Sequence, residues 1–227
     1  MLYSGLNQHN SNLREHQIEA KDKIFDAWDK YDSVMLQMPT GTGKTYLFTS
    51  IVNDLLAAYK EAHHDIHILV VAHRMELLDQ ISATLSRFGI AHGFIQGARE
   101  QHLWKRVQVA SIMSLLTEKN YYNTLRQKFD YIIVDEAHHS LADTYIKLFE
   151  LFPDAKKLGV TATPWRLNHE SFLKLYQTLI VSPQISWFIN NNLLADFDYV
   201  SIKPDSDIQQ LVDRSEVADT GDFSNSD

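Results

Sequence analysis

The sequence contains no cysteine, so disulfides, thiolate metal sites and thiol catalysis are excluded. It has no apolar run long enough to span a bilayer. Its polar N-terminus lacks the basic and apolar segments of a secretory signal. We therefore expect a cytoplasmic protein with no membrane partner. The histidines show no HExxH spacing and have no cysteine partners, which indicates polar surface residues rather than a metal site.

An excess of positive charge is also missing. The formal net charge is −8, but the acidic residues are concentrated at the end of the chain. Residues 204–227 carry seven acids and one base, which leaves residues 1–203 close to neutral. A protein that binds nucleic acid tightly by itself usually has a basic face, so we expect any such contact made by this chain alone to be weak.

Apolar runs of strand length alternate with helical patterns, which is typical of a parallel-sheet domain built from βαβ units. We predict strands at 34–38, 67–72, 107–110, 129–134, 158–162 and 196–202, and helices after Lys44, over 77–88 and over 142–152. Residues 170–195 give mixed signals. The prediction is an α/β domain over 1–203, with a mostly parallel central sheet and helices on both faces. Residues 204–227, acidic and poor in large apolar side chains, are interpreted as a linker.

A glycine-rich turn lies between the first predicted strand and the following helix, as a phosphate-binding loop requires. Its residues are Thr40, Gly41, Thr42, Gly43, Lys44 and Thr45. The glycines allow backbone angles that turn N–H groups toward phosphate oxygens, and the helix start adds its positive dipole end. Lys44 would contact the β- and γ-phosphates, and Thr45 would offer a hydroxyl to Mg²⁺. The general pattern begins with glycine where this chain has Met38.

Two adjacent carboxylates, Asp135 and Glu136, end the strand predicted at 129–134. Neighbouring residues on a strand point to opposite faces, so the pair can serve two centres. Asp135 can hold Mg²⁺, and Glu136 can orient and deprotonate an attacking water. An ordinary helix cap is the plain alternative, but the phosphate loop upstream favours the catalytic interpretation.

Taken in order, these segments resemble the motifs of superfamily 2 helicases. The phosphate loop and the DEAH sequence at 135–138 resemble motifs I and II, and TATP at 161–164 resembles motif III. LREHQ at 13–17 is similar to the glutamine motif, while AHRMEL at 72–77 and VASIMSL at 109–115 are similar to motif Ia and the motif that follows it. The resemblance is nearest to the restriction-enzyme-like and DNA-repair-like branch of the family, because of the sequences HRMELLDQ at 73–80 and TATPWR at 161–166.

The resemblance implies an N-terminal RecA-like ATP-binding domain and a set of residue roles. Gln17, with Arg14, would select adenine. His138 would hydrogen-bond toward Thr161 or Thr163 and link the state of the γ-phosphate to the nucleic-acid face. Nucleic acid, DNA more than RNA, would be contacted by the family's two backbone-binding stretches, which contain His73, Arg74 and Ser111 here.

The family also implies a second RecA-like domain that supplies an arginine finger, worth about 10³–10⁵ in rate. No second set of motifs follows residue 203, so we expect this chain to bind ATP and hydrolyse it weakly. Two alternatives remain open. One is a nucleotide-gated binding or regulatory module that never hydrolyses, which the presence of Glu136 opposes. The other is a P-loop kinase or small-molecule NTPase, which has no need of the glutamine and threonine motifs.

Overall fold

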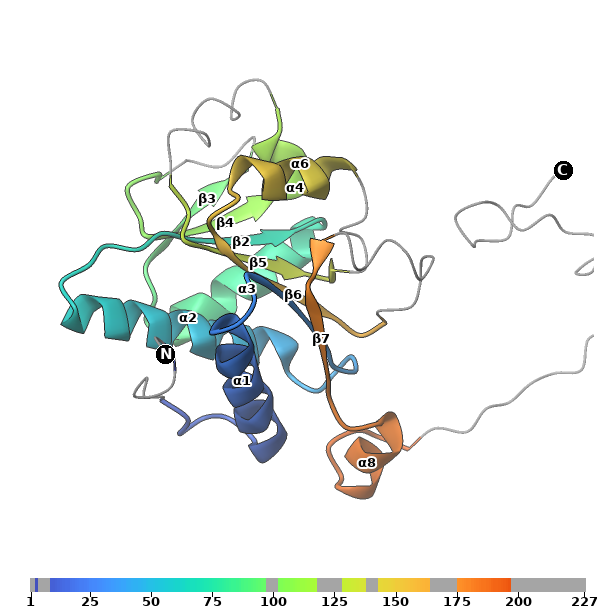
Figure 1. The fold of residues 1–227 in the computed structure, drawn as a ribbon. Coiled ribbons are helices and arrows are strands. Elements are labelled where there is room, and N and C mark those ends of the chain that lie inside the picture. The colour runs from blue at the N-terminus through green and yellow to red at the C-terminus, as the bar shows by residue number, and fades with distance from the viewer. Residues whose placement is uncertain are drawn as a thin grey trace, which may run out of the picture.

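The computed structural model describes residues 3, 9–96, 102–117, 128–137, 143–163 and 175–196. They contain one seven-stranded sheet in which all paired strands are parallel, in the order β3-β4-β2-β5-β6-β1-β7 (Figure 1). The strands are β1 (Ser33–Gln37), β2 (Ile68–Ala72), β3 (His92–Ile95), β4 (Val107–Ser111), β5 (Tyr131–Asp135), β6 (Lys156–Thr161) and β7 (Thr178–Val181). The predicted α/β class with a parallel sheet is confirmed.

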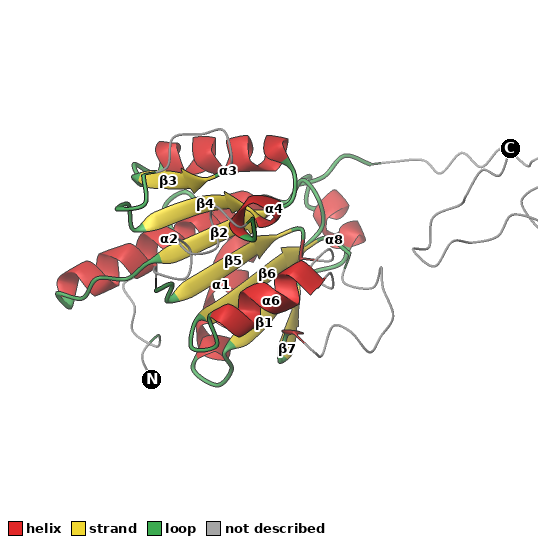
Figure 2. Ribbon diagram, turned by 90° about the horizontal axis from the view of Figure 1, so that it is seen from above, coloured by secondary structure: helices red, strands yellow, loops and turns green. Residues whose placement is uncertain are grey.

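Helices lie on both faces of this sheet, as Figure 2 shows from above. One face carries the three long helices, α1 (Glu15–Trp28), α2 (Lys44–Glu61) and α3 (Met75–Arg87). The other face carries α4 (Ile112–Leu115) and α6 (Asp143–Leu151). The short helix α8 (Ile185–Asn190) follows the edge strand β7. Within the described residues, none of the helices combines the length and the apolar character that a membrane span requires.

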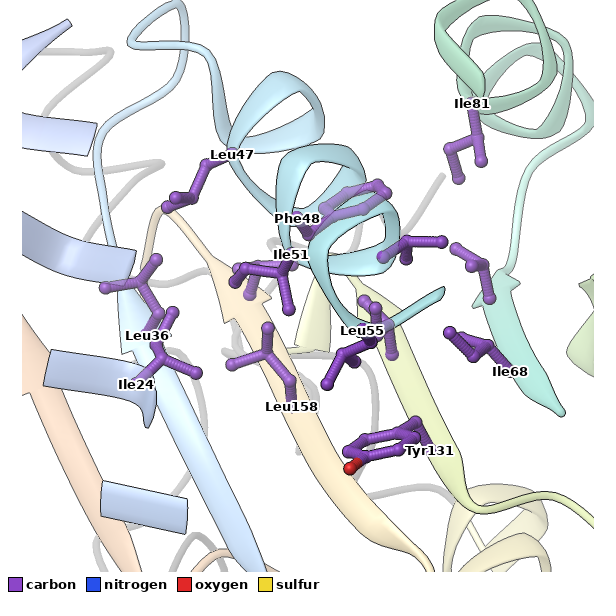
Figure 3. Packing of buried hydrophobic residues seen from close by; sticks show 14 of the residues in the cluster. Ile24, Leu36, Leu47, Phe48, Ile51, Leu55, Ile68, Ile81, Tyr131 and Leu158 are labelled. Atoms are coloured by element: carbon purple, nitrogen blue, oxygen red, sulfur yellow. The ribbon is translucent and has the colours of Figure 1, made fainter. Parts of the chain in front are cut away.

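Alternation along the strands produces two separate hydrophobic cores. In β1, Val34 and Leu36 belong to the core under the long helices, whereas Met35 belongs to the core under α4 and α6. Figure 3 shows Ile51 and Leu55 of α2 packed against the sheet. Both side chains are fully buried, and each buried aliphatic side chain contributes about 1.5–3 kcal/mol. This packing fixes α2, and with it the turn that precedes it.

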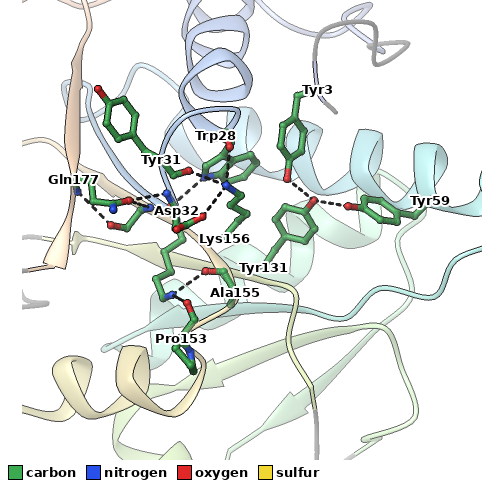
Figure 4. A network of polar contacts seen from close by, with 12 residues as sticks. Tyr3, Trp28, Tyr31, Asp32, Tyr59, Tyr131, Pro153, Ala155, Lys156 and Gln177 are labelled. Atoms are coloured by element: carbon green, nitrogen blue, oxygen red, sulfur yellow. Dashed lines mark hydrogen bonds and ion pairs between the residues drawn. The ribbon is translucent and has the colours of Figure 1, made fainter. Parts of the chain in front are cut away.

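The amino edge of the sheet, where the strands begin, is held by a polar network (Figure 4). The hydroxyl of Tyr131 is 2.8 Å from that of Tyr3 and 3.0 Å from that of Tyr59. Lys156 donates to the carbonyl of Trp28 at 2.7 Å and pairs with Asp32 at 2.8 Å. These bonds join α1, β5 and β6 at the edge opposite the glycine-rich turn.

The predicted strands differ from the observed ones mainly in their ends. The first strand covers 33–37 rather than 34–38, because Met38 already belongs to the turn, and β6 begins two residues earlier than predicted. Strands β3 and β7 and helix α8 had no prediction, since each is short. The predicted last strand at 196–202 lies outside the described residues except for Asp196, which is not in a strand. The linker predicted at 204–227 also lies outside them.

Candidate nucleotide site

The glycine-rich turn connects the carboxyl end of β1 to the start of α2. Gly41 and Gly43 have φ angles of 83° and 91°, in the left-handed region that favours glycine. A Cβ on Gly43 would also overlap the side-chain amide of Gln17. Thr42 is buried and its hydroxyl donates to the carbonyl of Pro39 at 2.6 Å. The turn is therefore held by its own Thr42–Pro39 hydrogen bond and by the side chain of Gln17 from α1.

Gln17 holds α1 against this turn. Its Nε2 lies 3.2 Å from the carbonyl of Thr42 and 3.1 Å from that of Gly43, and its Oε1 accepts the backbone N–H of Arg14 at 2.8 Å. The side chain is buried. The structure thus places Gln17 behind the loop, with its amide bonded to the backbone, while Arg14 is exposed at the start of α1.

Lys44, the first residue of α2, folds back over the turn. Its Nζ is 3.2 Å from the carbonyl of Met38 and 3.5 Å from that of Pro39. Burial lowers the pKa of this lysine, and the negative charges of Glu136 and Asp135 oppose the shift. Because its contacts to the two carbonyls are long and weak, phosphate oxygens could replace them as partners of the ammonium group.

Asp135 ends β5, two strands away from β1 in the sheet, and Glu136 follows it. Asp135 is buried and its Oδ1 accepts the backbone N–H of Glu136 at 3.0 Å. Glu136 has a φ of 52°, an unusual conformation for a side chain with a Cβ that costs about 1–3 kcal/mol. Such backbone strain is concentrated at functional sites. Here it lies directly after β5, at a residue that lines the cavity described below.

The threonine segment is bonded directly to the strand that leads into the turn. The backbone N–H of Met38 donates to the carbonyl of Thr161 at 2.9 Å, and Gln37 Nε2 donates to the carbonyl of Ala162 at 3.3 Å. The hydroxyl of Thr161 accepts the N–H of Thr163 at 3.1 Å. The side chain of Met38 is fully buried and belongs to the core under the long helices. His138, the predicted partner of these threonines, lies outside the described residues.

Most of the predicted phosphate-loop residues and the two carboxylates line one cavity of about 400 Å³, whereas Arg14, Gln17 and Thr42 do not line it. Its walls are formed by the phosphate loop, the acidic pair and one face of α3. The loop contributes Thr40, Gly41, Gly43, Lys44 and Thr45, the pair is Asp135 and Glu136, and α2 and α3 add Tyr46, Leu77, Gln80, Ala83, Thr84 and Arg87. Leu77 was predicted in a stretch that contacts nucleic acid, and the α3 face was not predicted as part of the nucleotide site, because it joins the site only through the packing of α3 beside α2.

The residues predicted to contact nucleic acid lie at the same carboxyl edge, after two neighbouring strands. Ser111 ends β4 and is paired in register with Ala72 at the end of β2. Arg74 is exposed, and its Nε donates to His73 Nε2 at 3.1 Å, whereas Ser111 is buried. Exposed Met113 lies two residues beyond Ser111. The structure thus brings the two stretches to one edge, although the Ser111 side chain has little access to solvent.

Comparison with known proteins agrees with this arrangement. The family described as "Type III restriction enzyme, res subunit" (ResIII) matches residues 10–166, more than half of the chain. The chain therefore belongs to this family, and its fold is that of the N-terminal RecA-like domain of superfamily 2 helicases.

Particular relatives can also be named. The chain is 33% identical over 191 residues to a 51.5 kDa protein of a Lactococcus phage (isolate 7-9), covering 84% of this chain and 36% of the relative. It is 30% identical over 154 residues to the DNA 3'-5' translocase XPB2 of Sulfurisphaera tokodaii, covering 68% and 31%. The Type ISP restriction-modification enzyme LlaGI, solved in complex with a DNA substrate mimic, superposes with a TM-score of 0.65 at 17% identity, covering 90% and 22%. The chain thus spans about a third of the length of these curated relatives.

Proposed function

We propose that this chain is the ATP-binding half of an ATP-dependent motor that moves on nucleic acid, with DNA favoured over RNA. The observation that carries the proposal is that the phosphate loop and the acidic pair line one cavity at the carboxyl edge of the sheet. The relatives add support, because one is named a DNA translocase and another was solved with a DNA mimic. Cytoplasmic location is part of the same proposal.

In this proposal the chain's own residues bind and orient the nucleotide. Gly41 and Gly43 let the loop wrap the phosphates, and Lys44 leaves the carbonyls of Met38 and Pro39 to neutralise the β- and γ-phosphates. Glu136 lies in the same cavity and accepts a proton from the attacking water. A second RecA-like domain would complete the cleft and supply the arginine finger.

The donor set fits Mg²⁺. The buried carboxylate of Asp135 and the hydroxyl-bearing Thr45 line the same cavity. Mg²⁺ in such sites is held by one or two protein oxygens together with phosphate oxygens and water. Among the residues that the structure describes, no cluster of three His, Cys, Asp or Glu side chains is present, which suits an ion that arrives with the nucleotide. When bound, the ion would neutralise charge developing on the phosphates.

Coupling to nucleic acid is proposed to pass through β1 and β6. The Met38–Thr161 bond joins the base of the phosphate loop to the threonine segment, so a loop movement on γ-phosphate loss would be transmitted to Thr163 and, in the DEAH sequence, His138. His73, Arg74 and Ser111 would then contact the sugar-phosphate backbone at the same edge. Residues 1–203 are close to neutral and have no excess of positive charge, which favours weak binding of nucleic acid by this part alone.

The test is calorimetric titration of the chain with ATP in the presence and absence of Mg²⁺. We expect Mg²⁺-dependent 1:1 binding and hydrolysis that nucleic acid hardly stimulates. Absence of ATP binding by the folded chain would overturn the proposal. Strong stimulated turnover would retain the motor but refute the need for a second domain.

The second candidate is a nucleotide-gated module that binds ATP without hydrolysing it. Glu136→Gln in a protein containing both motor domains separates the two, because only the acid–base function is lost. A motor should retain ATP affinity and lose at least about 100-fold in turnover. If neither the unaltered two-domain protein nor its Glu136→Gln variant hydrolyses ATP in a single-turnover experiment, the result would favour the binding module.

A further inference from the structure

A lysine and an aspartate form an ion pair that is completely buried between α1 and α2. The side chains of Lys21 on α1 and Asp54 on α2 have no exposed surface. Nζ of Lys21 also donates to the hydroxyl of Ser50 at 2.8 Å and to Oδ1 of Asn10 at 3.0 Å. The other carboxylate oxygen of Asp54 accepts the backbone N–H of His9 at 3.0 Å. The pair therefore joins α1, α2 and the segment that leads into α1.

Complete burial makes this pair better suited to fixing geometry than to adding stability. Burial lowers the pKa of Lys21, and hydrogen bonding and attraction to Asp54 oppose the shift. The cost of removing two charges from water can exceed their attraction, so apolar side chains of similar size are often as stable or more stable. Ion pairs and hydrogen bonds are directional, however, and they select one register between two helices where apolar contacts allow others.

The register of α1 on α2 matters for the nucleotide site because of Gln17. This residue is one helical turn before Lys21, so both side chains project from the same face of α1. Nε2 of Gln17 contacts the carbonyls of Thr42 and Gly43 at 3.2 and 3.1 Å. A shift of α1 by one residue would move this side chain about 1.5 Å along the helix axis and about 100° around it. Such a shift would break both contacts to the loop.

We propose that Lys21 and Asp54 are positioning residues for nucleotide binding, which fix α1 on α2 so that Gln17 holds the phosphate loop in its binding conformation. Both are fully buried, so they act through Gln17 and not by contact with the ligand. The close fit at Gly43 supports this role, because the amide of Gln17 occupies the space that a Cβ would need. The inference rests on the proposed ATP binding. A pair that only stabilises the fold would leave the ATP affinity of the folded chain unchanged.

The experiment replaces the pair in two ways and measures ATP affinity by calorimetry with Mg²⁺. The apolar variant, Lys21→Met with Asp54→Val, keeps the packing but loses the directional bonds. Its ATP affinity should fall about tenfold, as on loss of one good contact, while its stability to urea should be similar or higher. The amide variant, Lys21→Gln with Asp54→Asn, keeps a hydrogen bond between the helices, so its ATP affinity should stay within about twofold of that of the unaltered chain. Arg106→Gln with Asp65→Asn, which removes an exposed ion pair, is the matched control and should change nothing.

Gln17→Ala provides a readout that a purely structural role would not alter. In the unaltered chain and in the amide variant, this substitution should lower ATP affinity about tenfold. In the apolar variant it should lower the affinity less than about threefold, because Gln17 is already displaced and the two changes are not additive. If the apolar variant does not fold, Ser50→Ala takes its place. It removes one bond from Lys21 to α2, so ATP affinity should fall about twofold to threefold, and Gln17→Ala should again have a reduced effect.

Three results would overturn the inference. The first is an unchanged ATP affinity in the apolar variant, or in Ser50→Ala where that variant replaces it. The second is a full effect of Gln17→Ala in the same background. The third is an equal loss of affinity in the apolar and amide variants, which would assign the effect to the lost charges. In all three cases an unaltered chain that binds ATP retains the proposed function, whereas an unaltered chain that does not bind ATP refutes the proposed function itself.

Discussion

Lys44 and Lys157 are both buried lysines, and they lie at opposite edges of the same sheet. Burial lowers the pKa of each. Lys157, at the amino edge, donates to the carbonyls of Pro153 and Ala155 at 2.9 and 2.8 Å. Lys44, at the carboxyl edge, has carbonyls only at 3.2 and 3.5 Å and faces a cavity that contains two carboxylates. The same residue type therefore closes the fold at one edge and remains available for a ligand at the other.

The contrast extends to the neighbouring groups. At the amino edge the hydroxyls of Tyr3, Tyr59 and Tyr131 bond to one another, and burial raises the pKa of Tyr3 to about 12. At the carboxyl edge the backbone itself is strained at Glu136, a residue with a Cβ that lies at positive φ. Buried polar groups bonded within the protein stabilise the fold, whereas strained backbone beside an open cavity is typical of a ligand site. Substitutions at the two edges should therefore separate binding from stability.

The largest expected effect is on binding. Lys44→Ala removes the charge that faces the phosphates, so ATP affinity should fall at least about 100-fold. Stability should change by less than about 1 kcal/mol, because water can reach the carbonyls that Lys44 leaves. Calorimetry and chemical denaturation measure the two quantities. If Lys44→Ala unfolds the chain instead, then Lys44 stabilises the fold as Lys157 does, and the contrast between the two edges of the sheet is wrong.

Gly43→Ala should affect both quantities, because this residue is constrained by its backbone and by a neighbour. Its φ is 91° and an added Cβ would overlap the amide of Gln17, so we expect a loss of about 1–3 kcal/mol in stability together with weaker ATP binding. Gly89→Ala is the matched control: its φ is 69°, yet no atom lies within 4 Å of the added Cβ. It should cost about 1 kcal/mol through the backbone alone and leave ATP affinity intact.

At the amino edge the expected effect is on stability only. Tyr131→Phe removes the hydroxyl shared by Tyr3 and Tyr59, at a cost of about 1–2 kcal/mol in the free energy of unfolding. Tyr59→Phe removes one of these two bonds at a half-buried position and should cost less. Urea denaturation would give both values, and ATP titration should show unchanged affinity. A change in ATP affinity in Tyr131→Phe would mean that the two edges are coupled.

How far the sequence predicts this molecule depends on the range of the forces involved. The parallel sheet could be predicted, because the buried strands are apolar runs such as Ile68–Ala72 and the turn at 40–45 carries its own glycines. Short elements such as β3 and α8 could not, since their position is set by packing against distant residues: Phe188 of α8 packs on His16 of α1. The hydrogen bonds of the Gln17 amide to the backbone of the loop could not be predicted either, because nothing in the local sequence indicates which side of α1 contacts the loop.

The smallest expected effect is on the pH dependence of binding, and it concerns Lys44 alone. Its pKa in the free protein is lowered from 10.5, and bound phosphates favour the charged form. Between the pKa of Lys44 in the free protein and its higher pKa in the ATP complex, we expect binding to be accompanied by proton uptake, and ATP affinity should fall by less than tenfold per pH unit as pH rises. Calorimetry in two buffers of different ionisation enthalpy measures the proton directly. Lys44→Arg keeps its charge throughout this range, so its profile should be flat; a falling profile in that variant would assign the proton to another group at the carboxyl edge.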